Sequence, residues 1–483
     1  MDRQKQHNST DIVLINPPIR RLSYGRFDYF ASIGQPLGIG LLASNCIKEN
    51  LKCEIIDADA EYLDHDEVIE KLVTLNPKMV GISTMTPTMT SVGLLLSKIK
   101  SALPDTIRIL GGFHATALPE KTLKEEDVQF IIRGEGIEIL PMFIKSYLKY
   151  ANNNLFEIPN LSWIDSNGHY CENPIKKDAP ELDDLPWAAW DKFKMDNYRA
   201  YQWHGWGTTR KPYAVIYSSL GCPYNCRFCA VNMVYQRKIR FRSPENIVSE
   251  IDYLVKNYGV KTYWIKDDTF NINRKRVIDI CNLLIERNYN LNIYCYCRSE
   301  GLDVELAKLM YKAGFRWIAF GVEVGTQEML DQIKKDTTQE KIEKAFKAVH
   351  DAGMFVAANY LLGFEEDTED SCQKTIQFAK YLNADYSWFG LVVPYPGTEL
   401  YNDIIKKNIV LPEKWENFGH YVGSPIKLGN VHSERLMSLR QKAHIQTQFN
   451  IRYIYQFVKT FGVKSFFKDY LPRLWITCTG YKK

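Results

Sequence analysis

Three cysteines at short spacing are the residues of this chain whose types and positions most directly suggest chemistry. They lie within eight positions, separated by three residues and then by two: Cys222, Cys226 and Cys229. The apolar run Tyr213–Tyr217 precedes them and predicts a buried strand, which Gly221 and Pro223 interrupt. We therefore expect the cysteines on a loop at the carboxyl end of a strand, where their thiolates can converge on one soft metal centre.

Other uses of cysteine explain this spacing less well. The chain has 11 cysteines, an odd number, and its composition is typical of an intracellular protein, so a disulfide is not expected here. A structural zinc site needs four ligands, usually as two separated pairs, and no second close pair of that kind follows. Three thiolates suit a cubane iron–sulfur cluster in which one iron keeps an open position for a reacting ligand.

The segment 218–229, with the aromatic Phe228 before the last cysteine, resembles the signature of the radical S-adenosylmethionine (SAM) superfamily. This resemblance implies that the three cysteines hold a [4Fe–4S] cluster. It also implies that the open iron chelates the amino and carboxylate groups of SAM. One electron from the cluster would then cleave SAM to methionine and a 5′-deoxyadenosyl radical.

Length and composition describe a protein of more than one domain. A chain of 483 residues is too long for one core and predicts two or three domains. Its 45% hydrophobic and 24% charged residues are typical of soluble proteins, and its net charge of +4 does not require nucleic acid as a partner. The polar start Met1–Thr10 lacks a signal-peptide core and no apolar run approaches a membrane span, so a cytoplasmic location is expected.

Residues 1–150 are predicted to form one α/β domain. Short apolar runs alternate with amphipathic stretches, which favours a doubly wound parallel sheet with intervening helices. The strands are expected at Ile12–Ile15, Cys53–Asp57, Met79–Ser83, Ile107–Leu110 and Phe130–Ile132, and the helices include Leu37–Asn50, Asp66–Leu75 and Thr90–Ala102. Polar residues or glycines follow all five strands. Since such sheets bind ligands at the carboxyl ends of their strands, this pattern indicates a binding site.

These strand ends resemble the cobalamin-binding domain that precedes many radical SAM domains. The resemblance rests on a serine after the third strand and a Gly-Gly after the fourth, and the set that it implies is Ser83, Thr84, Gly111, Gly112, His114 and Gly134. The Asp-x-His-x-x-Gly motif, whose histidine ligates cobalt, is absent after the first strand. The resemblance thus implies cobalt without a histidine ligand, which suits methyl transfer. His114 belongs either to a pattern common in this group or to a hydrogen-bonded turn.

A connector is predicted at 151–210. The runs Asn160–Ile164 and Gly168–Glu172 flank a Ser-Asn-Gly turn and predict a hairpin. The Pro-, Asp- and Trp-rich stretch 180–190 resembles the linker between the two domains of this family. Four tryptophans near it either line a pocket or pack singly at the surface: Trp187, Trp190, Trp203 and Trp206.

Residues 211–400 are predicted to form a partial (β/α)6 barrel, because six apolar strands alternate with helical patterns. The strands are expected at Tyr213–Ser218, Thr262–Lys266, Asn292–Cys297, Trp317–Val322, Phe355–Leu362 and Ser387–Val393. The helices between them include Ser243–Asn257, Arg274–Arg287, Val304–Ala313, Gln339–Gly353 and Thr368–Leu382. The chemistry of such a barrel is expected at the carboxyl ends of its strands.

The resemblance to radical SAM enzymes implies that residues at these strand ends bind SAM: Asp267, Arg298, Glu323, Gly363 and Glu366. Asp267 is expected to accept hydrogen bonds from the SAM ammonium, with Asp268 as a helix N-cap. Arg298 either pairs with the SAM carboxylate or bridges neighbouring strand ends. The segment 359–366 resembles the adenine motif of the family, although Asn359 replaces its first glycine, and Glu366 either serves that motif or caps the next helix.

Residues 401–483 are predicted to form a helical carboxyl-terminal region. Its tail combines aromatic residues with basic ones, including Arg473 and Trp475. This composition favours a helical cap over the barrel. Peripheral contact with an anionic membrane surface is the alternative.

The resemblance covers about residues 10–400 and implies a cobalamin-dependent radical SAM enzyme that methylates an unactivated carbon. In such enzymes the adenosyl radical abstracts hydrogen from the substrate, and methylcobalamin then delivers a methyl group. The alternative within the family is oxidative cyclisation or ring contraction, and the alternative from another class is a cobalamin-binding sensor with a structural cluster. A small-molecule or lipid substrate and a reductant such as flavodoxin or ferredoxin are the expected partners, and nucleic acid is not.

Overall fold

The computed structural model describes residues 10–20, 32–150, 154–200, 211–419, 426–448 and 451–472. Within these ranges the amino-terminal part is built on one seven-stranded sheet of order β2-β1-β3-β4-β5-β6-β7. Its first five strands are parallel: β1 (Ile12–Asn16), β2 (Cys53–Asp57), β3 (Met79–Thr84), β4 (Ile107–Gly112) and β5 (Phe130–Ile132). The strand order reverses between β1 and β3, which places a topological switch point at their carboxyl ends.

Helices cover both faces of this sheet, as its continuous apolar strands require. On one face, α2 (Leu37–Lys48) and α8 (Ile139–Tyr150) enclose a buried cluster that includes Leu14 and Phe143. On the other face, α4 (His65–Leu75) and α5 (Met89–Ala102) enclose a second cluster that includes Val13. The predicted doubly wound sheet is confirmed.

The predicted hairpin belongs to the amino-terminal sheet. Its strands are β6 (Leu161–Ile164) and β7 (Tyr170–Glu172), and β6 pairs antiparallel with β5. Arg133 reinforces this edge through an ion pair with Glu172, at 2.9 Å. The sheet therefore continues past residue 150, where the sequence analysis places its boundary.

The central part is a six-stranded parallel sheet of order β8-β11-β12-β13-β14-β15. Its strands are β8 (Tyr213–Ile216), β11 (Thr262–Ile265), β12 (Asn292–Cys297), β13 (Phe315–Glu323), β14 (Phe355–Leu362) and β15 (Tyr386–Leu391). The helices that alternate with them are α10 (Pro244–Tyr258), α11 (Arg274–Arg287), α12 (Val304–Ala313), α13 (Gln327–Gln332), α14 (Gln339–Asp351) and α15 (Glu369–Leu382). In the described strands β8 and β15 form the two free edges, so the barrel is open, as predicted.

Two carboxyl-terminal helices, α17 (Ser433–Gln448) and α18 (Ile451–Ser465), pack against the barrel. The His444 ring meets the Phe389 ring of β15 edge-on at 5.6 Å, and Phe457 of α18 is buried in the barrel cluster. The described part of this region therefore packs over the barrel, as predicted for a helical cap. No helix in the ranges that the structure describes is long and apolar enough to cross a membrane. Arg473 and Trp475 lie outside the described residues, as do Trp203 and Trp206.

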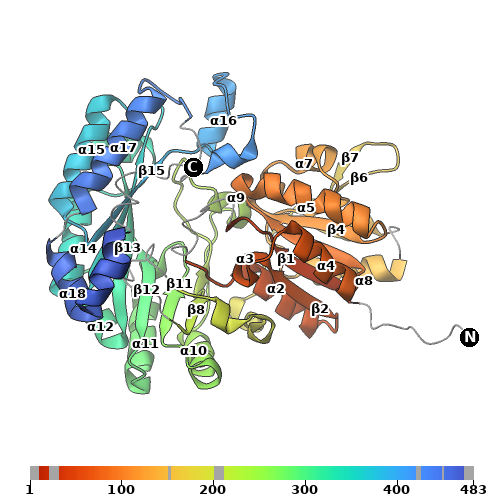
Figure 1. Ribbon diagram of the computed structural model, residues 1–483, viewed down its shortest axis with the longest axis horizontal. Coiled ribbons are helices and arrows are strands. Elements are labelled where there is room, and N and C mark those ends of the chain that lie inside the picture. Colours follow the sequence, from red (N-terminus) through yellow and green to blue (C-terminus); the bar gives the residue numbers. More distant parts are fainter. Residues whose placement is uncertain are drawn as a thin grey trace, which may run out of the picture.

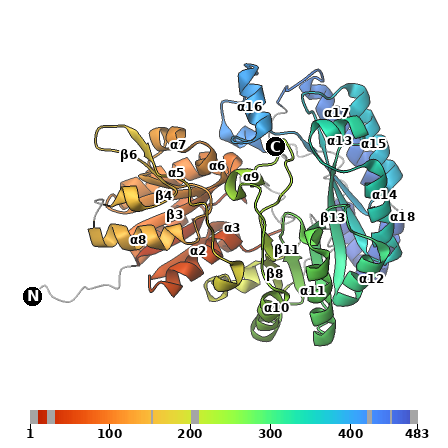
Figure 2. The same cartoon turned by 180° about the vertical axis from the view of Figure 1, so that it is seen from behind.

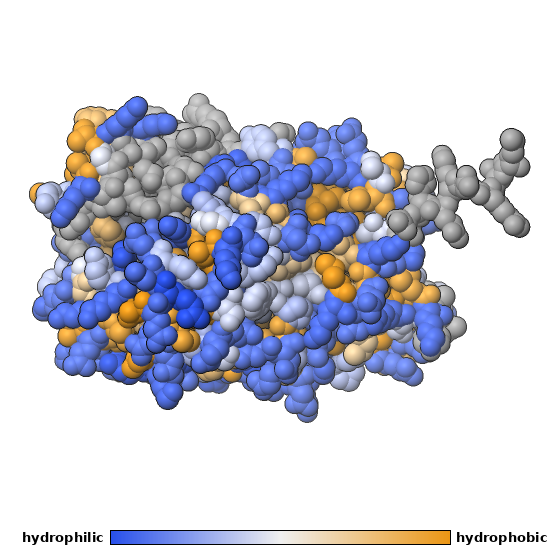
Figure 3. Space-filling view, turned by 90° about the horizontal axis from the view of Figure 1, so that it is seen from below, coloured by the Kyte–Doolittle hydropathy of each residue, from blue (hydrophilic) through white to orange (hydrophobic). Residues whose placement is uncertain are grey.

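The two sheets face each other across the middle of the molecule. In Figure 1 the amino-terminal sheet lies on the right and the barrel on the left, with α9 (Val231–Tyr235) between them, and Figure 2 shows the same relation from behind. Residues that follow strands of both sheets line one shared cavity, described below. On the face shown in Figure 3, hydrophilic side chains predominate and hydrophobic ones are scattered among them.

Candidate functional site

The loop with the three cysteines leaves the barrel after β8 and returns along a two-residue ladder. β9 (Ser219–Leu220) pairs antiparallel with β10 (Arg240–Phe241), so the intervening segment is closed at its base. Gly221 begins the loop with a φ of +89°, and a Cβ at this position would lie 2.1 Å from the carbonyl oxygen of Lys238. Only glycine meets both the backbone angle and the close approach.

Asp267 fixes the start of the cysteine loop. Its carboxylate accepts backbone hydrogen bonds from Ser218 at 2.6 Å and Ser219 at 3.0 Å, and hydroxyl hydrogen bonds from the same two serines at 2.5 and 2.7 Å. Asp267 is 2% exposed and does not line the cavity beside the cysteines. These four donors occupy the Asp267 carboxylate oxygens, which were predicted to accept hydrogen bonds from the SAM ammonium.

The three cysteines border a cavity of about 190 Å³ at the carboxyl ends of the barrel strands. All three are free and partly exposed. In the described residues no group of three or more His, Cys, Asp or Glu side chains converges as a single-ion site would require. Three cysteine thiolates on one loop are the ligand set of a cubane cluster that keeps one iron open. Burial raises the pKa of Cys229 to about 12, an effect that metal ligation reverses because it deprotonates the thiol.

Arg227, between the second and third cysteines, ties the loop to the rest of the barrel. Its guanidinium pairs with Glu366, with Asp403 of α16 (Glu399–Lys406) at 3.2 Å and with Glu365 at 3.4 Å. Its backbone N–H donates to Ile333 at 3.1 Å, and its carbonyl accepts from Leu400 at 3.0 Å. The cysteine loop is therefore held both through the Arg227 side chain and through its backbone.

Asp268, rather than Asp267, faces the cavity with the cysteines. Burial raises the pKa of Asp268 to about 6, and the neighbouring Asp267 charge adds to the shift. Arg298 also lines the cavity, but its Nε donates to Glu300 at 3.0 Å and its Nη2 to Asp336 O at 2.9 Å. Its guanidinium carbon lies 3.6 Å from the centre of the Tyr224 ring. Arg298 thus bridges neighbouring loops, which was one of the two predicted roles.

Glu323 ends β13 at the border of two cavities. It has a φ of +68°, and its carboxylate pairs with Lys335 at 2.9 Å. Burial opposes the charge of Lys335, but the negative charges of Glu323 and Cys226 together outweigh that effect, and the pKa of Lys335 is raised. A Cβ on Gly321 would lie 2.2 Å from Glu323 Oε1, so this pair depends on the absence of a side chain there.

Gly363 and Glu366 do not line either cavity. Gly363 packs against Leu436 of α17 and donates its N–H to Asp367 at 2.8 Å. Glu366 pairs with Arg227, and the N-cap of α15 is Thr368. Glu366 is therefore not the cap of α15, and its contact in the structure is a brace on the cysteine loop.

A second, larger cavity of about 510 Å³ adjoins the first and reaches the amino-terminal sheet. The two cavities share six lining residues: Phe228, Cys229, Val231, Tyr296, Glu323 and Asn359. The larger one also touches Met85, Thr86 and Pro87 after β3 and Phe113 after β4. One continuous space therefore joins the cysteine loop to the strand ends of the amino-terminal sheet.

The strand ends predicted to bind cobalamin divide into an open part and a packed part. Ser83 is exposed at the end of β3, and a Cβ on Gly111 would meet only a backbone oxygen at 3.6 Å. Thr84 is fully buried and donates to Gly111 O at 2.8 Å. Gly112 has a φ of +95°, and a Cβ there would lie 2.5 Å from Thr84 O. Ser83 and its register partner Gly111 form a cradle of small residues at the strand ends, while Thr84 and Gly112 hold the backbone.

His114 is a buried histidine of α6 (Phe113–Ala117) that lines neither cavity. It is 2% exposed, hydrogen-bonds Thr86 Oγ1 at 3.2 Å and meets the Trp415 ring edge-on at 4.7 Å. Burial, with a smaller contribution from the nearby Lys121 charge, lowers its pKa to about 4. This is the turn histidine that the sequence analysis gave as one alternative.

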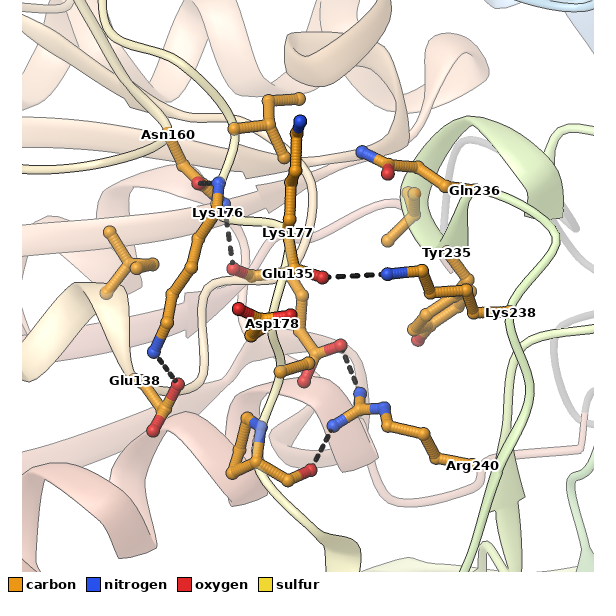
Figure 4. Close-up of a pocket in the computed structure, with 15 residues that line it drawn as sticks. Glu135, Glu138, Asn160, Lys176, Lys177, Asp178, Tyr235, Gln236, Lys238 and Arg240 are labelled. Carbon is orange, nitrogen blue, oxygen red and sulfur yellow. Dashed lines mark hydrogen bonds and ion pairs between the residues drawn. The ribbon is translucent and has the colours of Figure 1, made fainter.

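Gly134 follows β5 near a third cavity, of about 220 Å³, between the amino-terminal sheet, the connector and the segment after the cysteines (Figure 4). Gly134 donates its N–H to Thr116 at 2.9 Å. Around the cavity, Arg240 pairs with Glu135 and donates to Pro180 O at 2.5 Å, and Lys238 donates to Lys177 O at 2.8 Å. These contacts fasten the cysteine segment to the amino-terminal sheet.

The roles of several residues of the site were not predicted from the sequence. Asp268 was assigned to a helix cap, and Arg227, Lys335 and Tyr296 were not singled out. Arg227 sits inside the cysteine motif, which was the one available signal. Lys335 lies 12 positions from its partner Glu323 and belongs to no motif.

Comparisons with known proteins agree with this geometry. Residues 216–379 match the family model of the radical SAM superfamily, and residues 27–144 match that of the B12-binding domain. An uncharacterized methyltransferase of Pyrococcus horikoshii is 29% identical over 439 residues, which cover 90% of this chain and 91% of that protein. The anaerobic magnesium-protoporphyrin IX monomethyl ester cyclase of Rubrivivax gelatinosus is 27% identical and covers 75% of this chain and 65% of its own.

A solved structure shares the fold. The radical SAM methyltransferase TsrM from Kitasatospora setae, with cobalamin and a [4Fe–4S] cluster bound, superposes with a TM-score of 0.67 at 16% identity. The superposition covers 82% of this chain and 78% of that one. With both family models matched in this order, the chain is a radical SAM enzyme that carries an amino-terminal B12-binding domain, and its cofactors are a [4Fe–4S] cluster, SAM and cobalamin.

Proposed function

We propose that this enzyme methylates an unactivated carbon of a small molecule. The observation that carries the proposal is the continuous space between the two sheets, which the cysteine loop and the loops after β3 and β4 line together. A carbon bound there has the SAM site on one side and the cobalamin site on the other. The similarity to an uncharacterized methyltransferase of Pyrococcus horikoshii supports methyl transfer.

In this proposal the three cysteines hold the cluster, and Asp268 accepts hydrogen bonds from the SAM ammonium. Arg227 and Asp267 position the cluster loop, and the Glu323–Lys335 pair borders both cavities. When bound, the cluster, SAM and cobalamin supply the radical and the methyl group. The protein's part is to hold these groups close together and to exclude water from between them. The electron would come from a reductant such as flavodoxin or ferredoxin.

Ser83 and Gly111 border the proposed cobalamin site at the ends of β3 and β4. A cradle lined by a small hydroxyl side chain and a bare glycine admits a bulky ligand close to the backbone. His114 is buried against Thr86 and Trp415 and does not line the cavity between the two sheets. We therefore propose that no histidine of that turn ligates cobalt.

Oxidative cyclisation is the competing outcome, because the relative from Rubrivivax gelatinosus is named as a cyclase. The test is incubation of the anaerobically reconstituted enzyme with SAM carrying a trideuterated methyl group and with metabolites extracted from a deletion strain. Methylation predicts a product that gains the labelled methyl group. A product that loses hydrogen without gaining label would replace methylation by cyclisation.

A further inference from the structure

We propose that the substrate presents an uncharged, apolar carbon skeleton to the radical centre, bound in the 510 Å³ cavity between β14, β15 and the amino-terminal sheet. This inference rests on the function proposed above, since it names the substrate class of the same site. The cavity falls in the size range of small-molecule sites. Its position next to Cys229 places any occupant beside the proposed cluster.

Apolar and aromatic side chains make up most of the wall on the barrel side. These are Leu361, Tyr386, Trp388, Val392, Val393, Tyr395 and Pro396. Met85, Pro87 and Phe113 face them from the amino-terminal sheet, on the side expected for cobalamin. We therefore expect the substrate to contact the barrel side of the cavity.

Charge is sparse in this wall. None of the described residues that line the cavity is lysine, arginine or histidine, and Glu323 is the one acidic residue among them. Glu323 is already paired with Lys335 at 2.9 Å. A carboxylate or phosphate placed here would lose its hydration without gaining a cation from these residues, and burial of an unpaired charge is strongly unfavourable. An apolar skeleton gains instead from the area that it buries.

Trp388 shapes the wall through a neighbouring glycine. Residues two apart on a strand point to the same side, and the Trp388 ring lies over Gly390, where an added Cβ would be 2.4 Å from the ring. The glycine thus leaves room for the indole along β15, where Trp388 lines the cavity. Asn359, in the same lining, hydrogen-bonds Tyr296, and the rest of its amide can bind a single polar group on the substrate.

The test measures binding to the cobalamin-loaded, cluster-reconstituted enzyme with the neutral fluorescent probe Nile red. Dodecanol and dodecyl phosphate, which share one chain and differ in charge, are the competitors. We expect dodecanol to displace the probe at a concentration at least tenfold below that of dodecyl phosphate. Trp388→Arg keeps the bulk and adds a cation, so it should reverse this preference. Trp388→Ala should weaken probe binding at least fivefold.

Trp187 supplies the matched control. It lies outside this cavity and donates to Asn246 at 3.1 Å, so Trp187→Ala and Trp187→Arg should keep the wild-type order of competitors. Equal displacement by both competitors in the wild type, or a Trp388→Arg variant that behaves like Trp187→Arg, would overturn the proposal. Failure of Nile red to bind the cobalamin-loaded enzyme would do the same. A separate assay of 5′-deoxyadenosine formation tests the proposed function, so the two failures are distinguishable.

Discussion

Glu323 and Lys335 form an ion pair of 2.9 Å at the border of the two cavities, and the missing side chain of Gly321 leaves room for it. A methyl group on Gly321 would displace the Glu323 carboxylate, because its Cβ would stand 2.2 Å from Oε1 and 3.0 Å from Lys335 Nζ. Gly321→Ala should therefore weaken SAM binding about as much as Glu323→Gln does, by roughly tenfold. Equilibrium dialysis with the reconstituted enzyme measures this.

Gly38 is the control for this substitution, since a Cβ there meets nothing within 4 Å. Gly38→Ala should leave SAM affinity unchanged. If Gly321→Ala also left it unchanged while Glu323→Gln lowered it, the steric argument would be wrong.

The adjacent Asp267 and Asp268 should give different defects. Asp268→Asn removes the carboxylate that lines the cavity, and loss of a charge-assisted hydrogen bond predicts SAM affinity lower by about 1.5–3 kcal/mol, with the cluster retained. Asp267→Asn disturbs the four hydrogen bonds that fix Ser218 and Ser219, so it should lower iron content after desalting. Iron content and SAM affinity, the latter by equilibrium dialysis, are measured for both variants. Identical defects in the two variants would contradict the division of roles.

Ser83 offers a test of the cobalamin site that leaves the fold intact. Ser83→Trp should abolish hydroxocobalamin binding, because an indole would fill the cradle beside Gly111. Gly112 is unsuitable for this test, since any side chain there would clash with the backbone of Thr84 and distort the sheet. Absorbance after gel filtration measures bound cobalamin, and circular dichroism checks the fold. Undiminished binding in Ser83→Trp would place the cofactor elsewhere.

His114 should make the stability of the metal-free protein depend on pH. Its pKa is about 4 in the folded state against an ordinary value of 6.5, so the unfolded chain binds the proton more tightly. Stability contributed by neutral His114 is complete above pH 6.5 and is lost as the pH falls towards 4. The wild type should lose roughly 1–2 kcal/mol more than His114→Gln between pH 7.5 and 5.

Urea unfolding at the two pH values measures the difference, with His169→Gln on the exposed hairpin turn as the control. The control should keep the pH dependence of the wild type. An unchanged pH dependence in His114→Gln would show that the histidine accepts a proton without cost.

The sequence predicted the framework of the site well because strand and helix patterns are local. β12 (Asn292–Cys297) and β14 (Phe355–Leu362) agree with the predicted ranges to the residue, as does α11 (Arg274–Arg287). Apolar runs bounded by glycine, proline or polar residues define such elements without knowledge of their neighbours. The cysteine loop was likewise readable, since its spacing is contained in twelve residues.

The roles of the residues around that loop depend on contacts that no local pattern contains. Asp267 and Asp268 are chemically alike, and only the pairing of Asp267 with Ser218, 49 positions away, decides which one faces the cavity. Arg227 meets Asp403 across 176 positions and Glu366 across 139 positions, so neither partner could be found from a local pattern. The hairpin was found, but its pairing with β5 was not, because register between distant strands is set by the assembled sheet.

We propose above that Cys222, Cys226 and Cys229 hold the cluster that cleaves SAM. The most direct measurement is iron content and 5′-deoxyadenosine formation by the anaerobically reconstituted wild type and by the variant in which all three cysteines are alanine, with dithionite and SAM. A variant with Cys46, Cys53 and Cys281 replaced serves as the control, since these cysteines are buried away from the cavity. We expect about four irons and product formation in the wild type and the control, and neither in the variant without Cys222, Cys226 and Cys229. Four irons and 5′-deoxyadenosine from that variant would contradict the proposal.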